Sequence, residues 1–164
     1  MEKMKKFFAI LGICVAATGF TFAGDRHITK QELPVEARAF LSAHYGQTGI
    51  AYATVDREVF DTTYAVSLND GTRLEFSRNG DWVEIKSPRG GKIPMSAIPE
   101  KIASYIKKNY PKADVRQIEI DGRDCEVALS NGVEITFDRK LEMVRTNDWP
   151  KYGPNHRFTW RDAR

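Results

Sequence analysis

Residues 64–76 read YAVSLNDGTRLEF, and residues 125–137 read CEVALSNGVEITF. In both stretches apolar and polar side chains alternate on either side of a turn that contains Gly71 or Gly132. Such alternation places one face of a strand in a core, and Asp-Gly or Asn-Gly between two alternating runs is typical of a β-hairpin. The two stretches therefore predict two antiparallel hairpins of similar design.

A helical pattern precedes each hairpin. The first begins after Pro34 and ends at Gly46, and the second begins after Pro99 and ends at Pro111. Proline suits a first helical turn, where no backbone N–H is missed, and Gly or Pro ends a helix. Apolar residues recur at the spacing of one helix face. These residues are Ala37, Phe40, Leu41 and Tyr45 in the first helix and Ile102, Tyr105, Ile106 and Tyr110 in the second.

Each copy of this pattern reads as a helix followed by four antiparallel strands in a meander. We therefore predict an α+β fold of two tandem helix-plus-four-strand units, with the helices packed on one face of the sheet and the other face open. Two such units can also join edge to edge, which hides an edge strand of each. The predicted segments are a lead-in 24–32, a first unit 33–86, a linker 87–97, a second unit 98–146 and a C-terminal tail 147–164.

Residues 1–23 have the parts of a secretory signal peptide. A basic start precedes an uncharged run of 16 residues, 7–22, and the segment ends at Ala23. The run is shorter than the roughly 20 residues that span a bilayer, so we expect cleavage after Ala23 rather than a retained anchor. Acylation of Cys14 is disfavoured because Ile13 precedes it. These features predict a periplasmic protein with no stable membrane insertion after cleavage.

The composition disfavours several function classes. The formal net charge is +3, and no basic cluster of the kind that binds nucleic acid is present. The three histidines lie far apart, and no metal, nucleotide or nucleophile motif has its required spacing. Cys125 alternates in phase with Val127 and Leu129, which predicts a buried, unreactive thiol. We therefore predict no catalytic residue, no metal site, no cofactor and no enzyme activity.

The repeated order of motifs resembles the PepSY-like, beta-lactamase-inhibitor-like family. The order is Leu-Pro or Ile-Pro, a helix ending in Tyr-Gly or Tyr-Pro, strands, and Asp-Gly or Asn-Gly followed by a strand that ends in Phe. The resemblance covers about residues 33–146. It implies a secreted bacterial protein, often with two tandem units, with helices on one face of an antiparallel sheet. It implies no established reaction and no catalytic residues. The residues that carry it are Leu33, Pro34, Phe40, Leu41, Tyr45 and residues 70–76 in the first copy, and Ile98, Pro99, Tyr105, Ile106, Tyr110, Pro111 and residues 131–137 in the second.

The face predicted to be free of helices carries the candidate binding residues. Aromatic residues, Met and Arg are enriched at protein interfaces. The predicted partner-binding residues are Trp82, Arg73, Glu75, Glu84, Glu134, Met143 and Arg145.

We therefore predict a non-catalytic periplasmic binding module that presents this face to an envelope protein or peptide, as an inhibitor or an envelope-stress component. The alternative is an envelope protein that binds a small molecule or metal ion through Asp and Glu of the same face or of the turns. An enzyme ranks last. The aromatic tail 147–164 either folds back over Trp82 or stays loosely attached.

Overall fold

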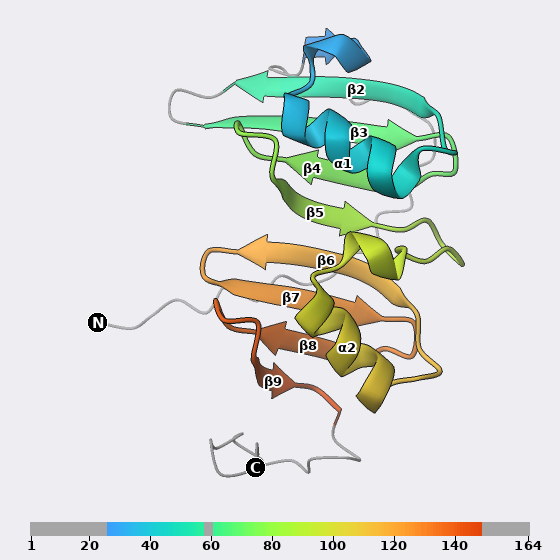
Figure 1. The fold of residues 1–164 in the computed structure, drawn as a ribbon, viewed down its shortest axis with the longest axis vertical. Helices are drawn as coiled ribbons and strands as arrows, with labels where there is room; N and C mark the ends of the chain where they lie inside the picture. Colours follow the sequence, from blue (N-terminus) through green and yellow to red (C-terminus); the bar gives the residue numbers. More distant parts are fainter. Residues whose placement is uncertain (1–25, 58–60, 149–164) are drawn as a thin grey trace.

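The computed structural model describes residues 26–57 and 61–148, which form one nine-stranded antiparallel sheet (Figure 1). Each strand pairs with the strand that follows it in the chain, so the order runs from β1 to β9 without a crossover. The strands are β1 (Arg26–Ile28), β2 (Ile50–Arg57), β3 (Thr62–Leu68), β4 (Arg73–Phe76), β5 (Trp82–Lys86), β6 (Val115–Asp121), β7 (Asp124–Leu129), β8 (Glu134–Phe137) and β9 (Met143–Thr146).

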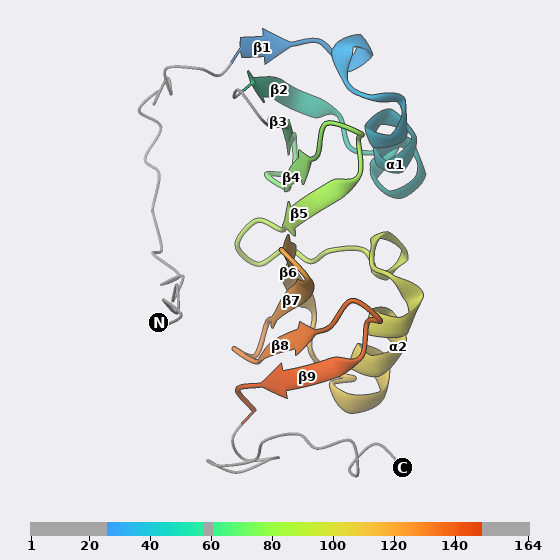
Figure 2. The same cartoon turned by 90° about the vertical axis from the view of Figure 1, so that its left-hand side faces the viewer.

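Two helices, α1 (Val35–Tyr45) and α2 (Glu100–Asn109), lie on the same side of this sheet (Figure 2). Each begins directly after a proline, as the sequence predicts. Short 3-10 turns, η1 (Lys30–Glu32) and η2 (Met95–Ala97), precede them. Among the residues that the structure describes, no helix is long and apolar enough to cross a membrane.

A single cluster of buried hydrophobic residues lies between the helices and the sheet. Phe76 and Phe137 are almost completely buried in it. Their rings meet those of Phe40 and Tyr105 edge-on, with centroid distances of 6.1 and 5.4 Å. Edge-to-face packing is a favoured arrangement for aromatic pairs, so each helix is fixed on the sheet by a ring contact.

The prediction of two tandem helix-plus-four-strand units is wrong. β5 and β6 pair directly, with Ile85 opposite Ile118, and both side chains belong to the one hydrophobic cluster. In addition, β1 extends the sheet at the start of the described chain by pairing with β2. The protein is therefore dominated by a continuous nine-stranded sheet. Pairing β5 with β6 satisfies two edges that would otherwise expose backbone donors and acceptors.

The connection between β5 and α2, residues 87–97, is bonded to the sheet. The backbone N–H of Ser87 donates to the carbonyl of Arg116 at 2.8 Å, and that of Ile93 donates to the carbonyl of Val115 at 2.9 Å. The Ile93 side chain is buried in the core. These bonds hold the connection against β6, on the way to α2, which lies on the same side of the sheet as α1.

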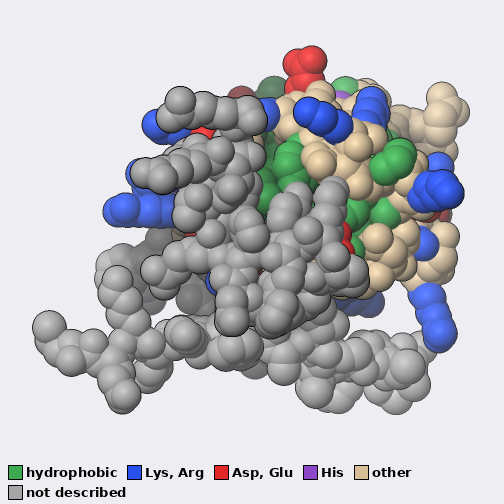
Figure 3. Space-filling model, turned by 90° about the horizontal axis from the view of Figure 1, so that it is seen from below, with side chains coloured by type: hydrophobic (Ala, Val, Ile, Leu, Met, Phe, Trp, Pro, Cys, Tyr) green, Lys and Arg blue, Asp and Glu red, His purple; other side chains and the backbone are tan. Residues whose placement is uncertain are grey.

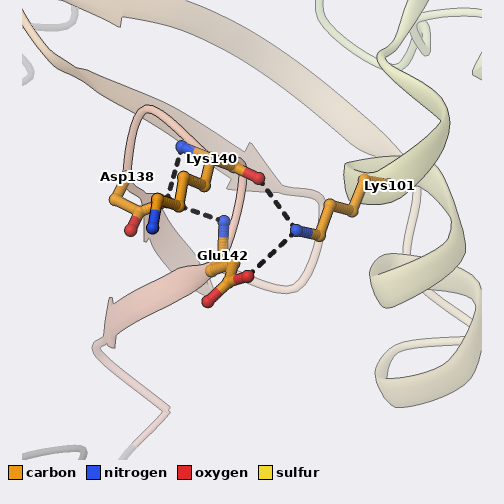
Figure 4. Close-up of polar contacts among 4 residues, drawn as sticks. All are labelled: Lys101, Asp138, Lys140 and Glu142. Carbon is orange, nitrogen blue, oxygen red and sulfur yellow. Dashed lines mark hydrogen bonds and ion pairs between the residues drawn. The ribbon is translucent and has the colours of Figure 1, made fainter. Parts of the chain in front are cut away.

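The turn between β8 and β9 is tied to α2 (Figure 4). An Asp138 carboxylate oxygen accepts the backbone N–H of Lys140 at 2.8 Å and that of Glu142 at 3.0 Å. Lys101 of α2 donates to the carbonyl of Lys140 at 2.9 Å and lies 3.2 Å from the Glu142 carboxylate. Within the turn Leu141 adopts φ 58°, a conformation that few non-glycine residues take. Because the Lys101–Glu142 pair is exposed, it orients the turn more than it stabilises the fold.

The β9 edge is where the described chain ends. Viewed onto this end, the described surface shows hydrophobic side chains with Lys and Arg side chains around them (Figure 3). Asn147 fixes the exit of the chain. Its side chain accepts the backbone N–H of Glu134 at 2.7 Å and donates to the carbonyl of Gly132 at 3.2 Å. The predicted signal peptide 1–23 and residues 149–164 of the predicted tail lie outside the described residues.

Candidate binding site on the open face of the sheet

A row of directly opposed residues crosses the whole sheet, and both helices lie on one side of that sheet (Figure 2). Directly opposed residues in antiparallel strands point to the same face. The chain neighbours of this row, such as Leu74, Ile85 and Ile118, are buried on the helix side. The row must therefore lie on the open face. Its members are His27, Thr54, Ala65, Glu75, Glu84, Glu119, Glu126, Thr136 and Arg145.

Four consecutive members of this row are glutamates, one on each of β4 to β7. We call Glu75, Glu84, Glu119 and Glu126 the glutamate row. Neighbouring strands lie ~4.8 Å apart, and like charges directly opposite one another destabilise a sheet. An uninterrupted run of four carboxylates is therefore costly to the fold and favours a role for the face.

Side-chain donors offset part of this repulsion. The Gln117 amide donates to Glu84 at 2.7 Å and to Glu119 at 3.4 Å. At the far end Arg145 lies 3.5 Å from the Glu126 carboxylate and donates to the Thr136 hydroxyl at 3.2 Å. The bond from Gln117 to Glu84 joins β6 to β5, so Gln117 also supports the junction at the centre of the sheet.

An electrostatic cost is evident at Glu84. Burial raises the pKa of its carboxyl, and the charges of Glu75 and Glu119 raise it further. Lys86 and Arg73, which oppose each other in the next row of the same face, lower it. The ionised form of Glu84 is thus disfavoured in the folded protein, and a cation placed over the row would relieve the repulsion.

We expect Glu84→Gln to be more stable than the native protein at pH 7 and nearly equal to it at about pH 4. The pKa of this carboxyl is higher in the folded protein than its ordinary value of 4.5. Its contribution to the stability of the fold is therefore fully present only below about pH 4.5. This stability is lost as pH rises through the raised folded pKa. Glutamine keeps the oxygen that accepts from Gln117 and removes the charge. Urea unfolding of both proteins over this pH range measures the difference.

Glu134→Gln is the matched control, because Glu134 lies exposed on the same face beyond the glutamate row. We expect a smaller change for this variant over the same pH range. A Glu84→Gln variant that is no more stable than the native chain at pH 7 would contradict the electrostatic account.

The structure brings five of the predicted binding residues onto the open face. Glu75, Glu84 and Arg145 lie in the transverse row itself. Arg73 and Glu134 lie in the adjacent row, which runs from β4 to β8 through Gln117. Their part in binding a partner stays a prediction.

Trp82 and Met143 were predicted on the same face, and the structure corrects this placement. Trp82 lies opposite Phe76, and Met143 lies opposite Phe137. Met143 is buried, and Trp82 is partly buried against the same core. The cause is a β-bulge at the start of β5 and of β9, which inserts one residue and reverses the alternation. Any cover of Trp82 by residues 149–164 lies outside the described residues.

Gln117 and Glu119 also lie on the open face, and they were not among the binding residues predicted from the sequence. Both alternate with Ile118 in β6, so their outward direction could be read from the sequence. Their position next to Glu84 could not, because 28 residues, 87–114, separate β5 from β6 and no turn motif fixes the pairing. The register of that central junction is what assembles the glutamate row.

Cys125 confirms the predicted buried thiol. Its side chain is 5% exposed, and burial raises its pKa to about 12, with a smaller contribution from Glu126. The thiolate is the reactive form of cysteine, so almost none is present at neutral pH.

We expect the Cys125 thiol to react with a disulfide reagent only when the protein unfolds. The labelling rate should rise with denaturant in parallel with unfolding, because the side chain is buried and its pKa is high. Labelling of the folded chain from Gly24 at the rate of a free thiol would contradict this assignment.

The described residues offer a charged surface on the open face of the sheet. Within residues 26–57 and 61–148, no three His, Cys, Asp or Glu side chains form a group that could hold a metal ion. The glutamate row spreads its carboxylates along a sheet. That arrangement suits contact with cationic groups distributed along a partner.

The fold and this surface define a sheet protein with two helices on one face and an acidic row on the other. The chain belongs to the family described as "Putative beta-lactamase-inhibitor-like, PepSY-like", whose model matches residues 62–145. The resemblance read from the repeated motifs is thereby confirmed at the level of the family.

Solved structures of similar proteins come from Bacteroides. A protein from Bacteroides vulgatus described as a "putative periplasmic protein" of the DUF2874 family is 34% identical, with a TM-score of 0.70, over 76% of this chain and 97% of that one. A second B. vulgatus protein, described as a "putative periplasmic protein of unknown function", is 35% identical, with a TM-score of 0.68, over 76% and 100% of the two chains. A protein from Bacteroides thetaiotaomicron described as a "putative calcium-regulated periplasmic protein" is 31% identical, with a TM-score of 0.70, over 76% and 97%.

A search of curated proteins finds no match. The relatives are thus described as periplasmic proteins, and their descriptions assign no reaction.

Proposed function

We propose that this protein is a non-catalytic periplasmic binding module that presents its open sheet face to a protein or peptide with basic side chains. In this proposal the chain is exported by residues 1–23, cleaved after Ala23, and not acylated at Cys14. The description of its relatives as periplasmic supports the location. The family label names an inhibitor-like fold, and a shared fold does not transfer a function.

The observation that carries the proposal is the glutamate row. Four carboxylates on adjacent strands repel one another, and Glu84 is disfavoured in its ionised form. A partner that places Lys or Arg along the row would relieve this repulsion. Complementary charge contributes to specificity and to the rate of association.

The test is a crosslinking pull-down from envelope extract with the chain from Gly24 as bait. A partner held by the open face should be captured by the native bait and lost with Glu119→Lys/Glu126→Lys. The matched control is Asp81→Lys/Asp114→Lys, which changes the net charge equally at exposed loop residues outside the row. Circular dichroism establishes that all three baits are folded. Equal capture by all three, or capture by none, would overturn the proposal.

A second candidate function is binding of Ca²⁺ by the same carboxylates. It is favoured by the description of the 31% identical B. thetaiotaomicron protein as calcium-regulated. Carboxylate oxygens are the ligands that Ca²⁺ prefers, although a calcium site gathers six to eight oxygens around one point. The described glutamates lie in a row, so this function would need side chains to converge.

Thermal unfolding with increasing Ca²⁺ tests this candidate, since a ligand that prefers the folded state raises the Tm. A rise with Ca²⁺ that exceeds the rise with Mg²⁺, and that is lost in Glu84→Gln/Glu119→Gln, would support it. An unchanged Tm across the titration would remove it.

A further inference from the structure

The open face and the end of the described chain carry opposite charges. We propose that residues 149–164 of this same chain dock on the glutamate row. The segment reads WPKYGPNHRFTWRDAR, with four basic residues against one acidic residue. This proposal goes beyond the proposed function and does not rest on it, because the segment can cover the face whether or not a partner exists.

The point where the chain leaves the sheet favours this occupant. β9 is the edge strand, and its Arg145 belongs to the transverse row. Asn147 then fixes the exit at the β8–β9 edge through its 2.7 Å bond to the backbone N–H of Glu134, whose side chain lies on the open face. The last described residue, Asp148, donates its backbone N–H to the Thr146 hydroxyl at 3.2 Å. The following segment therefore starts at the border of the face that it would cover.

The segment is long enough to reach every carboxylate of the row. From β9 to β4 the sheet has five strand spacings, or about 24 Å. Sixteen residues, 149–164, span up to about 50 Å when extended. A segment tethered this close has an effective concentration of about the millimolar range, so weak contacts suffice for docking.

A guanidinium of the segment would add most at Glu119 of β6, because Glu126 of β7 already lies 3.5 Å from Arg145. Glu84 lies near Lys86 and Arg73, which lower its pKa, whereas Glu119 is further along the row. Within the described residues Glu119 receives one hydrogen bond, from Gln117 at 3.4 Å. Arg157 and Arg161 of the segment each present a planar guanidinium, which pairs with carboxylates in a bidentate manner.

The segment also carries apolar groups that gain from docking. Its aromatic residues are Trp149, Tyr152, Phe158 and Trp160. These side chains would lie over the aliphatic stems of the glutamates, of Gln117 and of Lys86, which long polar side chains offer to an apolar neighbour. In this proposal the basic residues position the segment on the glutamate row, and burial of the aromatic rings adds to its affinity for the face.

Paramagnetic relaxation enhancement on the whole chain from Gly24 tests this proposal. A nitroxide is attached at Thr159→Cys, and the buried Cys125 leaves that position as the reactive thiol. We expect loss of amide signal intensity in β5, β6 and β7, with α1 and α2 much less affected because they lie on the other side of the sheet. High salt should restore the signals, since about 1 M salt shortens the Debye length to ~3 Å.

Two full-length variants separate charge pairing from non-specific contact. Glu119→Gln/Glu126→Gln should restore the signals of β5 to β7, and Asp81→Asn/Asp114→Asn should leave them attenuated. Equal attenuation on both sides of the sheet, or none, would overturn the proposal. Attenuation that appears only between labelled and unlabelled molecules in a mixed sample would also overturn it, because the segment would then dock on a second copy.

The relaxation experiment tests docking of the segment and the pull-down tests binding of a partner, so either proposal can fail while the other stands. A segment that does not dock leaves the open face available for capture of a partner, and an empty pull-down leaves the relaxation data unaffected. If both succeed, removing the basic charges with Arg157→Gln/Arg161→Gln should increase capture of the partner by the native face, because the segment and the partner would compete for the same carboxylates.

Discussion

Ile118→Ala should lower the free energy of unfolding by about 2–5 kcal/mol, the range for removing a large buried aliphatic side chain. Ile118 is completely buried and lies opposite Ile85 where β5 meets β6. The cavity would open at the centre of the sheet, in the one hydrophobic cluster that both helices cover. Neither helix can move into it without losing its own contacts, so little relaxation is available. Urea unfolding followed by circular dichroism measures the loss.

Ile120→Ala is the matched control, since the same strand carries this isoleucine 45% exposed. Its loss should be about 1 kcal/mol or less. Both variants should unfold in a single transition, because one sheet and one core join the two halves of the chain. Two separate transitions, with Ile118→Ala affecting only one of them, would contradict a continuous cooperative sheet.

The local elements of this fold could be predicted from the sequence. The helix between Pro34 and Gly46 is confirmed as α1, and the turns at Gly71 and Gly132 are where the alternation places them. These features depend on neighbours in the chain: proline and glycine restrict φ, and a period of two specifies a strand. Pairing across the middle of the sheet depends on residues that lie far apart in sequence. For that reason the edge-to-edge join was only one possibility from the sequence, and two tandem units were predicted where the structure has one nine-stranded sheet.

In the candidate site, too, the features that depend on one strand could be predicted and those that depend on distant residues could not. The outward direction of Glu75 and Glu84 follows from alternation within one strand. Trp82 was misplaced because alternation was extended through the start of β5, where a bulge reverses it. The bulge follows a turn at Gly80 that lies close to the start of α1, and the alternation of residues within β5 does not reveal it.

Gly80→Ala tests this close approach. Gly80 adopts φ 89° in the turn between β4 and β5. A Cβ there would lie 2.8 Å from Cβ of Pro34 and 2.9 Å from the backbone nitrogen of Ala37, at the start of α1. The positive φ costs an alanine about 1–2 kcal/mol, and overpacking against backbone atoms adds about 1–3 kcal/mol. We therefore expect a loss of about 2–5 kcal/mol in the free energy of unfolding, measured by urea titration.

Gly132→Ala separates the two contributions, because Gly132 has φ 82° and a Cβ there would meet nothing within 4 Å. It should lose only the backbone share, about 1–2 kcal/mol. Leu141 occupies the position in the β8–β9 turn that Gly80 holds in the β4–β5 turn, and it adopts φ 58° with a full side chain. The β8–β9 turn thus holds a side chain at positive φ. If Gly80→Ala lost no more than Gly132→Ala, then α1 would not rest on the turn, and the contact could not be the reason that glycine is required there.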